Sequence, residues 1–512
     1  MALATVITRA QSGLDAPEVS VEVEVAGGLP ALTVVGLVET AVKESRERVR
    51  AAIRAAGFEF PSARVTVNLG PANLPKAGSR FDLAIAVGLL AATRQLPAEL
   101  LADHEFLGEL SLSGQLRPVP ALLPALIAAQ QAGRRCVLPA ACEGEAGLLP
   151  AASIGLADHL LDVARYLRGD AELRGPKVRP AVDSRADLPD LADVRGQHLA
   201  RRALEIAAAG GHHLLFIGPP GTGKSMLARR LPGLLPVLDD RAALETAALG
   251  SLAGRPVTGL SRSPPFCAPH HTATAVAMVG GGQATRPGEI SLAHHGVLFL
   301  DELPEFPRGA LEALREPLET GAITICRARR TVHYPARFQL LAAMNPCPCG
   351  FAGDPRRECR CSPQQAQRYR GRISGPLLDR LDLHVGLSWE PPLPNLDEHP
   401  AGESSGAVRV RVAAARQRQQ ARAGGPNARL GRAGVREFCQ PKAPARRLLA
   451  EAAERLCLSA RACDRVLRVA RTIADLAAQE RIDRVHVGEA LSLHQGWPRD
   501  AANSVPMPAT GT

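Results

Sequence analysis

Aromatic side chains are scarce in this chain: phenylalanine, tryptophan and tyrosine together make up 3% of its 512 residues. Any hydrophobic core must therefore be built from Leu, Val, Ala and Ile. Long apolar runs are also missing, since none reaches the ~18 residues that a membrane-spanning helix needs. The N-terminus lacks the charged and then apolar pattern of a secretory signal. These absences predict a cytoplasmic protein without a membrane partner.

Acidic residues are in the minority, with 51 Asp and Glu against 61 Lys and Arg and a formal net charge of +10 at pH 7. This balance favours a polyanionic partner such as nucleic acid, although charge alone does not prove one. The 11 cysteines do not predict a disulfide framework, because the chain is long and lacks a secretory signal. They indicate reduced thiols or metal ligands. The length exceeds what one core sustains and predicts about three domains.

One glycine-rich stretch, Gly218–Ser225, carries the clearest chemical signal. It fits the pattern G-x-x-x-x-G-K-[ST], between an apolar run that predicts a buried parallel strand and a segment that predicts a helix. Glycines allow backbone N–H groups to surround phosphate oxygens. We expect Lys224 to reach the β- and γ-phosphates and Ser225 to hold Mg²⁺. The predicted nucleotide-binding residues are Gly218, Pro219, Pro220, Gly221, Thr222, Gly223, Lys224 and Ser225.

A second apolar run, residues 296–300, ends in the carboxylates Asp301 and Glu302. We expect Asp301 to complete the Mg²⁺ site and Glu302 to orient and polarise the attacking water. Such a run is a weak signal alone, because strands often end in acidic turns, but it is strong when it follows a P-loop. The predicted chemistry is therefore ATP hydrolysis.

The first 170 residues predict an α+β domain. Period-two alternation predicts strands over 19–25 and 64–68, and helical spacing predicts a helix over 40–56. The other elements expected there are a buried helix over 81–92, a hairpin over 107–117 and a helix over 122–132.

Two segments of this domain, residues 73–82 and 108–119, are similar to the Lon protease domain. The resemblance places the serine nucleophile of that family at Arg80 and its lysine base at Leu123, and neither side chain can form a Ser–Lys dyad. It implies a proteolytically inactive Lon-like domain, as in RadA-type recombination ATPases. Two interpretations remain for the polar side chains Lys76, Arg80 and Asp82. They form either a surface recruited for DNA or a turn with salt bridges.

Charged residues and prolines predict a linker over 171–190, followed by an ATPase core over 191–395. The core resembles AAA+ ATPases. In that family the segment before the first helix contacts adenine, which makes Val194 and Gly196 candidates for this contact.

Two further segments of the core stand out. Residues 265–291 resemble the insertion in magnesium chelatase AAA+ subunits and in the ComM/YifB family, and its adjacent His270 and His271 favour a structural or channel-facing role over one metal site. Residues 321–335 predict a β-hairpin, which in related AAA+ rings points into the central channel. A basic tip there would follow a phosphate backbone, and an ordinary solvated turn is the alternative. The predicted DNA contacts at the tip are Arg327, Arg329 and Arg330.

Three more positions are expected to act in hydrolysis. Asn345 ends an apolar run and fits the sensor position, whose side-chain amide helps to hold the attacking water. The segment 374–383 is similar to the one that carries the arginine finger of chelatase-like rings, which implies that Arg380 acts on a neighbouring subunit in an oligomer, most simply a hexamer. The segment 459–475 resembles the sensor-two helix, which implies that Arg461 touches the γ-phosphate bound by its own chain.

Cys347 and Cys349 form one C-x-C pair, and Cys359 and Cys361 form another after nine intervening residues. Four thiolates at this spacing can close a tetrahedral site, for which Zn²⁺ is the natural ion in a reducing compartment. Redox-active or buried thiols are the alternative. Arginines around the cluster are compatible with a DNA contact.

A helical lid is expected over 396–500 and a disordered tail over 501–512. The first lid helix, 408–422, begins a segment without acidic residues, which favours a polyanionic partner. We predict DNA contacts from Arg416 and Arg418. The other helices are predicted over 445–456, 460–478 and 485–493.

Nearly the whole chain, in order, resembles the ComM/YifB family of magnesium chelatase-like AAA+ ATPases, with specific motifs at 280–291, 345–350 and 374–380. The implied fold is α/β, an AAA+ P-loop core with an α-helical lid, preceded by an α+β domain like that of Lon protease and of ribosomal protein S5 domain 2. The implied function is an ATP-driven hexameric DNA helicase for branch migration in homologous recombination and natural transformation. It would use ATP, Mg²⁺ and Zn²⁺, with single-stranded and branched DNA and recombination proteins as partners.

The alternative function is a motor subunit of the magnesium chelatase type, which drives metal insertion or protein remodelling. The basic lid and the N-terminal domain disfavour it. An ATP-dependent protease is disfavoured by Arg80 and Leu123, and a non-catalytic binding module by Lys224, Glu302 and Arg380.

Overall fold

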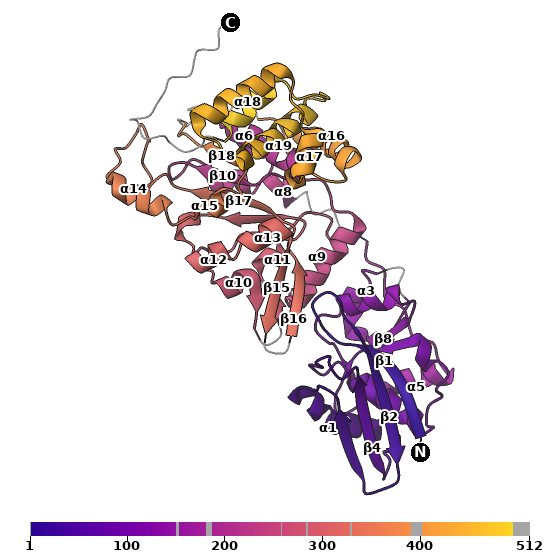
Figure 1. The fold of residues 1–512 in the computed structure, drawn as a ribbon. Helices are drawn as coiled ribbons and strands as arrows, with labels where there is room; N and C mark the ends of the chain where they lie inside the picture. The colour runs from indigo at the N-terminus through magenta and orange to yellow at the C-terminus, as the bar shows by residue number, and fades with distance from the viewer. Residues whose placement is uncertain are drawn as a thin grey trace.

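The computed structural model describes residues 2–149, 153–180, 187–257, 259–282, 285–327, 330–390 and 402–494. Figure 1 shows an N-terminal sheet with its helices at one end, a central sheet, and a group of helices at the other end. The tail expected over 501–512 lies outside the described residues, as do parts of the expected linker and residues 391–401.

The N-terminal sheet has seven strands in the order β3-β4-β2-β1-β5-β8-β9. β1, β2 and β4 pair antiparallel, and β5, β8 and β9 continue the sheet in parallel from β1. The strands are β1 Ala2–Arg9, β2 Glu18–Ala26, β3 Ala31–Val35, β4 Arg64–Gly70, β5 His104–Phe106, β8 Arg135–Pro139 and β9 Ile154–Ala157, with a short hairpin of β6 Glu109–Leu110 and β7 Leu116–Arg117. The helices are α1 Thr40–Ala55, α2 Asp82–Ala92, α3 Leu123–Gln131, α4 Glu143–Ala146 and α5 Leu160–Arg168.

Helix α2 is buried at every residue, which confirms the buried helix predicted over 81–92. Its sequence is apolar all round after Asp82, so it has no face suited to water. It packs against β1 and β2 and forms one core with the inward-facing valines of the sheet. The alternating strands and the hairpin predicted over 107–117 are also present.

The polar side chains of the Lon-like segment are buried, so their interpretation as a DNA-binding surface is wrong. Lys76, Arg80 and Asp82 are 0%, 3% and 0% exposed. Arg80 Nη2 donates to the carbonyl oxygen of Pro120 at 2.6 Å, and burial lowers the pKa of Arg80 to about 10. Asp82 forms a salt bridge with Arg48 at 2.7 Å. These groups hold the segment together internally, as the alternative interpretation proposed.

The central sheet is parallel, with strand order β11-β14-β17-β10-β18. β10, β14 and β17 are buried at every residue, which is why they form unbroken apolar runs in the sequence. The predicted α/β core is therefore confirmed. The strands are β10 Leu214–Ile217, β11 Phe266–Cys267, β14 Val297–Leu300, β17 Gln339–Met344 and β18 Leu383–Gly386. The helices are α6 His198–Gly210, α7 Lys224–Ala228, α8 Leu231–Leu234, α9 Asp240–Leu252, α12 Arg308–Glu312, α13 Arg315–Thr320, α14 Pro363–Arg370 and α15 Gly375–Leu378.

Two hairpins extend from this core. One is the insertion of α10 Ala275–Val279, β12 Gly280–Gly281, β13 Arg286–Pro287 and α11 Glu289–Leu292. The other pairs β15 Ala322–Arg327 with β16 Arg330–Pro335, which confirms the predicted hairpin in its backbone. Arg329 and the side chains of Arg327 and Arg330 lie outside the described part of the chain.

The second hairpin lies beside the N-terminal part of the chain (Figure 1). A Cβ at Gly13, whose φ is +61°, would lie 2.7 Å from Cγ1 of Val332 in β16. Only glycine fits such a close approach in this backbone conformation. Nearby, Ser251 Oγ of α9 donates to Glu145 Oε2 of α4 at 2.8 Å. The N-terminal part is therefore packed onto the core, and it is not a freely tethered module.

Helices α16 Ser405–Ala423, α17 Arg432–Phe438, α18 Ala443–Leu456, α19 Ala460–Leu476 and α20 Arg484–Ser492 follow the central sheet. The predicted helical region is confirmed, with α17 as an addition that the sequence did not predict. α16 and α19 pack against α6, so their apolar faces join the core of the sheet. Among the described residues, no helix combines the length and the hydropathy needed to cross a membrane.

Candidate functional site

The P-loop begins where β10 ends, at the carboxyl edge of the central sheet. Asp301 follows β14 and Asn345 follows β17, so their parallel strands bring both to the same edge. Lys224 Nζ donates to the carbonyl oxygens of Gly218 at 2.7 Å and Pro219 at 2.8 Å. It also donates to Asn345 Oδ1 at 3.1 Å. The structure thus brings the predicted lysine and the predicted sensor amide into direct contact.

The charged groups of this edge fit a magnesium nucleotide. Burial lowers the pKa of Lys224 to about 8, and the carboxylates of Asp301 and Glu302 act in the opposite direction. An arriving phosphate adds negative charge and favours the charged lysine further. Ser225 Oγ donates to Asp301 Oδ2 at 2.5 Å. Hydroxyl and carboxylate oxygens are ligands that Mg²⁺ prefers, so this pair fits the predicted magnesium site.

Glu302 has a left-handed backbone, with φ 53° and ψ 48°. This conformation is uncommon for a residue other than glycine and is concentrated at functional sites. The amide of Glu302 donates to Asp301 Oδ1 at 3.0 Å. Its carboxylate is half exposed, and Oε2 lies 3.2 Å from Nδ1 of His271.

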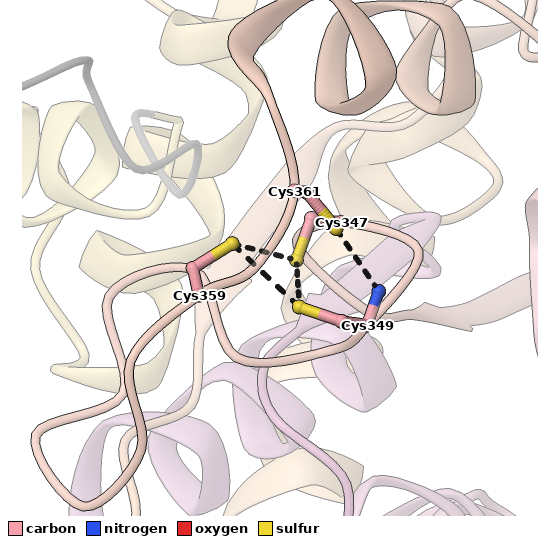
Figure 2. A group of neighbouring side chains, drawn as sticks. All are labelled: Cys347, Cys349, Cys359 and Cys361. Atoms are coloured by element: carbon pink, nitrogen blue, oxygen red, sulfur yellow. Dashed lines mark hydrogen bonds between the residues drawn. The ribbon is translucent and has the colours of Figure 1, made fainter.

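The cysteine cluster lies in the loop between β17 and α14 (Figure 2). Sγ of Cys347 lies 3.4 Å from Sγ of Cys349 and 3.6 Å from Sγ of Cys359, and the latter two sulfurs are 3.6 Å apart. The sulfurs of all four cysteines, Cys361 included, lie within 4.8 Å of one another. A tetrahedral Zn²⁺ site with bonds of 2.3 Å places its sulfurs about 3.8 Å apart. The four side chains therefore fit zinc in number, chemistry and spacing.

This loop also contacts the P-loop. A Cβ at Gly350, whose φ is +85°, would lie 2.7 Å from Cδ of Pro220. Cys347 is fully buried two residues after Asn345. The cysteine loop therefore forms one wall of the nucleotide site, a relation that the C-x-C spacing alone did not reveal.

We expect purified protein to contain about one zinc per chain, because the four thiolates close a tetrahedral site. The double change Cys347→Ser and Cys361→Ser should abolish zinc binding, whereas Cys457→Ser, at an exposed cysteine outside the cluster, should leave it unchanged. Elemental analysis after gel filtration measures the ratio. A folded, active protein without metal would contradict the zinc site.

A cavity of about 950 Å³ opens at the opposite, amino-terminal edge of the central sheet, where its lining includes His213 before β10 and Gln339 at the start of β17. Arg380 and Arg461 both line it. Arg461 therefore lies at the edge away from the P-loop of its own chain, and its expected role toward the γ-phosphate stays a prediction. The next arginines along α19 contact the segment before β18 at that edge, Arg465 through Asp379 and Arg468 through Asp382. The arginines lining the cavity are Arg337, Arg380, Arg416, Arg429, Arg461, Arg465 and Arg468.

Arg416 lines this cavity, and its side chain is half-buried. Its Nε and Nη2 donate to the carbonyl oxygen of Ala208 at 3.0 and 2.7 Å, and burial lowers its pKa to about 10. It holds α16 to α6 through these two bonds, and its DNA contact stays a prediction. Arg418 is exposed, with Nη1 donating to the carbonyl oxygen of Asp475 at 3.0 Å, and its DNA contact stays a prediction.

Glu245, His294 and His295 form a second group of metal-ligand types. Nε2 of His294 and Nε2 of His295 face the same Glu245 oxygen at 3.4 and 2.8 Å. His294 Nδ1 accepts the backbone N–H of Arg337 at 2.9 Å, and burial lowers the pKa of His294 to about 3. The neutral ring therefore carries its proton on Nε2, which then cannot ligate a metal. This group ties α9 to the loop before β14.

Several residues near the two sites escaped the sequence analysis. Arg465 and Arg468 lie on the same face of α19 as Arg461, and their spacing of four and three residues was the available signal. The phenol of Tyr369 in α14 lies near the backbone of Asn345, and burial raises the pKa of Tyr369 to about 12. No local sequence pattern predicts this proximity of Tyr369 and Asn345, because the two residues belong to separate segments.

Three family models match the chain. The model described as magnesium chelatase, subunit ChlI, matches residues 190–392, and its C-terminal counterpart matches 402–494. A third, described as subunit ChlI of Mg-chelatase, matches residues 21–142. Together the models cover most of the N-terminal sheet, with β1 and β9 outside the match, and the central sheet and the helical region.

Full-length relatives are also similar. The chain is 50% identical over 494 residues to the uncharacterized protein YifB of Escherichia coli K12, covering 96% of this chain and 97% of that protein. It is 47% identical over 499 residues to the competence protein ComM of Haemophilus influenzae, covering 96% and 97%. The similarity to the magnesium-chelatase 67 kDa subunit of Heliobacterium mobile is 28% identity over 225 residues, 38% of this chain and 30% of that protein.

Proposed function

Because the chain belongs to the YifB/ComM family of magnesium chelatase-like AAA+ proteins, we propose that it hydrolyses ATP to move along DNA. The observation that carries the ATPase part is the meeting of Lys224, Asn345 and the Ser225–Asp301 pair at one edge of the central sheet. These groups provide a cation for phosphate oxygens, an amide for the attacking water and oxygen ligands for Mg²⁺.

Each residue has a separate role in the proposed hydrolysis. The backbone N–H groups of residues 218–223 hold phosphate oxygens, and Lys224 exchanges its carbonyl partners for the β- and γ-phosphates. Ser225 and Asp301 hold Mg²⁺, which when bound stabilises the charge that develops on the phosphates. Glu302 orients and polarises the attacking water. Most of the rate enhancement then comes from positioning and charge stabilisation.

Arg380 and Arg461 line the edge opposite the P-loop of their own chain. We therefore assign both to the nucleotide of a neighbouring subunit, whose P-loop edge would face this cavity in a closed ring. Arg465 would support them, since it donates to the carbonyl oxygen of Asp379, next to Arg380. The proposed active form is an oligomer, with a hexamer as the ring that the family resemblance implies.

DNA is the proposed track of this motor. The net charge of +10 favours a polyanion, and the β15–β16 hairpin carries Arg327, Arg329 and Arg330 around its tip. Several such tips in one ring would follow a phosphate backbone without reading its sequence. A relative with 47% identity is named a competence protein. On this basis we propose branch migration of single-stranded and branched DNA during recombination and natural transformation, with recombination proteins as partners.

The proposed division of the chain follows these roles. Residues 1–170 form a Lon-like domain without proteolytic activity, and 171–190 form a linker. Residues 191–395 form the ATPase core with the basic hairpin and the cysteine loop. Residues 396–500 form the helical lid.

DNA should stimulate the steady-state ATPase, and the stimulation should weaken with salt because phosphate contacts release counterions. Between about 50 and 200 mM salt, we expect the half-saturating DNA concentration to rise at least about tenfold. The combined change of Arg327, Arg329 and Arg330 to Ala should reduce stimulation and leave the rate without DNA intact. Arg455→Ala, at an exposed arginine of α18, is the matched control.

The competing candidate is a chelatase-type motor for metal insertion or protein remodelling. The similarity to the 67 kDa magnesium-chelatase subunit favours it, although that match covers 38% of the chain. If neither single-stranded nor branched DNA changes the steady-state ATPase rate at either salt concentration, the chelatase-type motor becomes the favoured function.

A further inference from the structure

One turn of the chain, residues 347–350, lies between the cysteine cluster and the nucleotide site, and we call it the cysteine turn. The backbone N–H of Gly350 donates to the carbonyl oxygen of Cys347 at 3.0 Å and closes the turn, which carries two of the four cysteines. A Cβ at Gly350 would lie 2.7 Å from Cδ of Pro220 and 3.8 Å from Cγ of Asn345. The turn that presents two sulfurs to a metal therefore packs directly against the P-loop and the predicted sensor amide.

The P-loop side of this contact has to change when a nucleotide binds. The backbone N–H of Gly218 donates to the carbonyl oxygen of Met344 at 3.2 Å, so the P-loop starts bonded to the end of β17. Lys224 Nζ donates to Asn345 Oδ1 and to the carbonyl oxygen of Pro219. To reach the β- and γ-phosphates, the lysine has to leave these partners. An arriving nucleotide would therefore rearrange and then fix the surface against which the cysteine turn packs.

The metal side of the contact depends on the four sulfurs. The two C-x-C pairs meet through their sulfurs and through the backbone N–H of Cys349, which donates to Sγ of Cys361 at 3.4 Å. Thiols are weak donors and acceptors, so these contacts alone hold the turn loosely. Four bonds to Zn²⁺ would join the pairs tightly, because the free energy of metal binding becomes folding free energy of the loop that supplies the ligands. The metal therefore determines how firmly the cysteine turn is held.

The far end of the cysteine loop returns to the same segment. α14 begins two residues after Cys361. At the end of this helix, Arg370 Nε donates to the carbonyl oxygen of Pro346 at 3.2 Å, and the buried phenol of Tyr369 lies near the backbone of Asn345. Both ends of the metal-binding loop are therefore fastened to the two residues that follow β17. Order imposed by the metal would reach the sensor position from both directions.

Metal and nucleotide would order one packed contact, so the second ligand to bind meets a surface that the first has already ordered. We propose that a zinc ion in the cysteine cluster and a nucleotide on the P-loop strengthen each other's binding, with the cysteine turn as the link. The proposal rests on the nucleotide site of the proposed function and gives the metal a role beyond holding its own loop. Linkage requires that the nucleotide raise zinc affinity by the same factor by which zinc raises nucleotide affinity.

The test measures both affinities in the full chain. Competition with a zinc-binding dye gives the zinc affinity with and without Mg²⁺ and a non-hydrolysable ATP analogue. Titration of the same analogue, in fluorescent form, into zinc-loaded and zinc-depleted protein gives the nucleotide affinity. Each affinity should rise about fivefold or more in the presence of the other ligand, which is the lower end of couplings between sites. In Lys224→Ala, whose nucleotide site is impaired, the analogue should leave the zinc affinity unchanged, and this arm also corrects for zinc taken up by the analogue itself.

Two glycine variants separate the cysteine turn from the rest of its loop. Gly350→Ala places a methyl group against Pro220 and should bring the coupling factor close to one, while the protein still binds zinc and the analogue. Gly353→Ala is the matched control and should keep the full coupling. Gly353 also has a left-handed backbone, with φ +78°, but no atom of the described residues lies within 4 Å of the position of its Cβ.

The outcomes distinguish the coupling from the nucleotide site on which it rests. Unchanged or weaker zinc binding in protein that holds the analogue would overturn the coupling, as would protein that binds the analogue but no zinc. Equal losses of coupling in Gly350→Ala and Gly353→Ala would overturn the cysteine turn as the link. Failure of the zinc-loaded, unaltered protein to bind the analogue would instead show that the proposed nucleotide site has failed, and the coupling would fail with it.

Discussion

Arg380→Ala should leave ATP binding intact and lower kcat for ATP hydrolysis by about 10³–10⁵-fold, the range seen when an arginine finger is missing. The cause is geometric. Arg380 lines the cavity at the amino-terminal edge of the sheet, where it pairs with Glu319, and the P-loop of its own chain lies at the opposite edge. Its removal therefore cannot disturb nucleotide binding in the same subunit. Binding of a fluorescent ATP analogue and steady-state turnover measure the two quantities separately.

A mixing experiment decides whether Arg380 acts between subunits. Lys224→Ala chains cannot use their own nucleotide site but carry an intact Arg380, and Arg380→Ala chains carry the reverse defect. Mixed rings should recover part of the activity that neither variant has alone. Arg455→Ala serves as the charge-matched control and should be fully active alone. Absence of recovery in verified mixed oligomers would mean that Arg380 does not act across a subunit interface.

Glu302→Gln should retain ATP and lower kcat about 10²–10⁴-fold, because an amide of the same shape cannot accept a proton from water. Lys224, Ser225 and Asp301 remain in place, so the bound nucleotide persists and holds the ring assembled. Size-exclusion chromatography with ATP should show a stable oligomer, and the bound nucleotide should be ATP when it is extracted. Normal turnover by this variant would refute the role of Glu302 in activating water.

The nucleotide site was predictable because its residues belong to motifs that are continuous in the sequence. Gly218–Ser225 is a continuous motif, and Asp301 and Asn345 each end an unbroken apolar run. Parallel strands with both faces covered produce such runs, and their carboxyl ends share one edge. The contact from Lys224 to Asn345 then follows from topology.

The placements that the sequence did not predict concern side chains whose surroundings come from distant segments. Arg461 was placed by its likeness to a helix of known role, but the contacts of α19 with the segment before β18 decide which edge it faces. Arg416 was predicted on the surface because its segment lacks acidic residues, yet its guanidinium donates to the carbonyl oxygen of Ala208. For Lys76 the sequence left open a DNA-binding surface and an internal turn with salt bridges, and its full burial decides against the surface.

On the Lon-like interpretation, the burial of Arg80 and Leu123 makes the loss of proteolysis a one-way step in the history of the fold. Serine in place of Arg80 would leave the carbonyl of Pro120 without its partner, and lysine in place of Leu123, which is 0% exposed, would bury an ammonium group. Either substitution alone would destabilise the protein without creating a Ser–Lys dyad. Selection would therefore have no favourable single-substitution intermediate to retain. Descendants would inherit this domain as a scaffold, and new roles for it would have to arise on its outer faces.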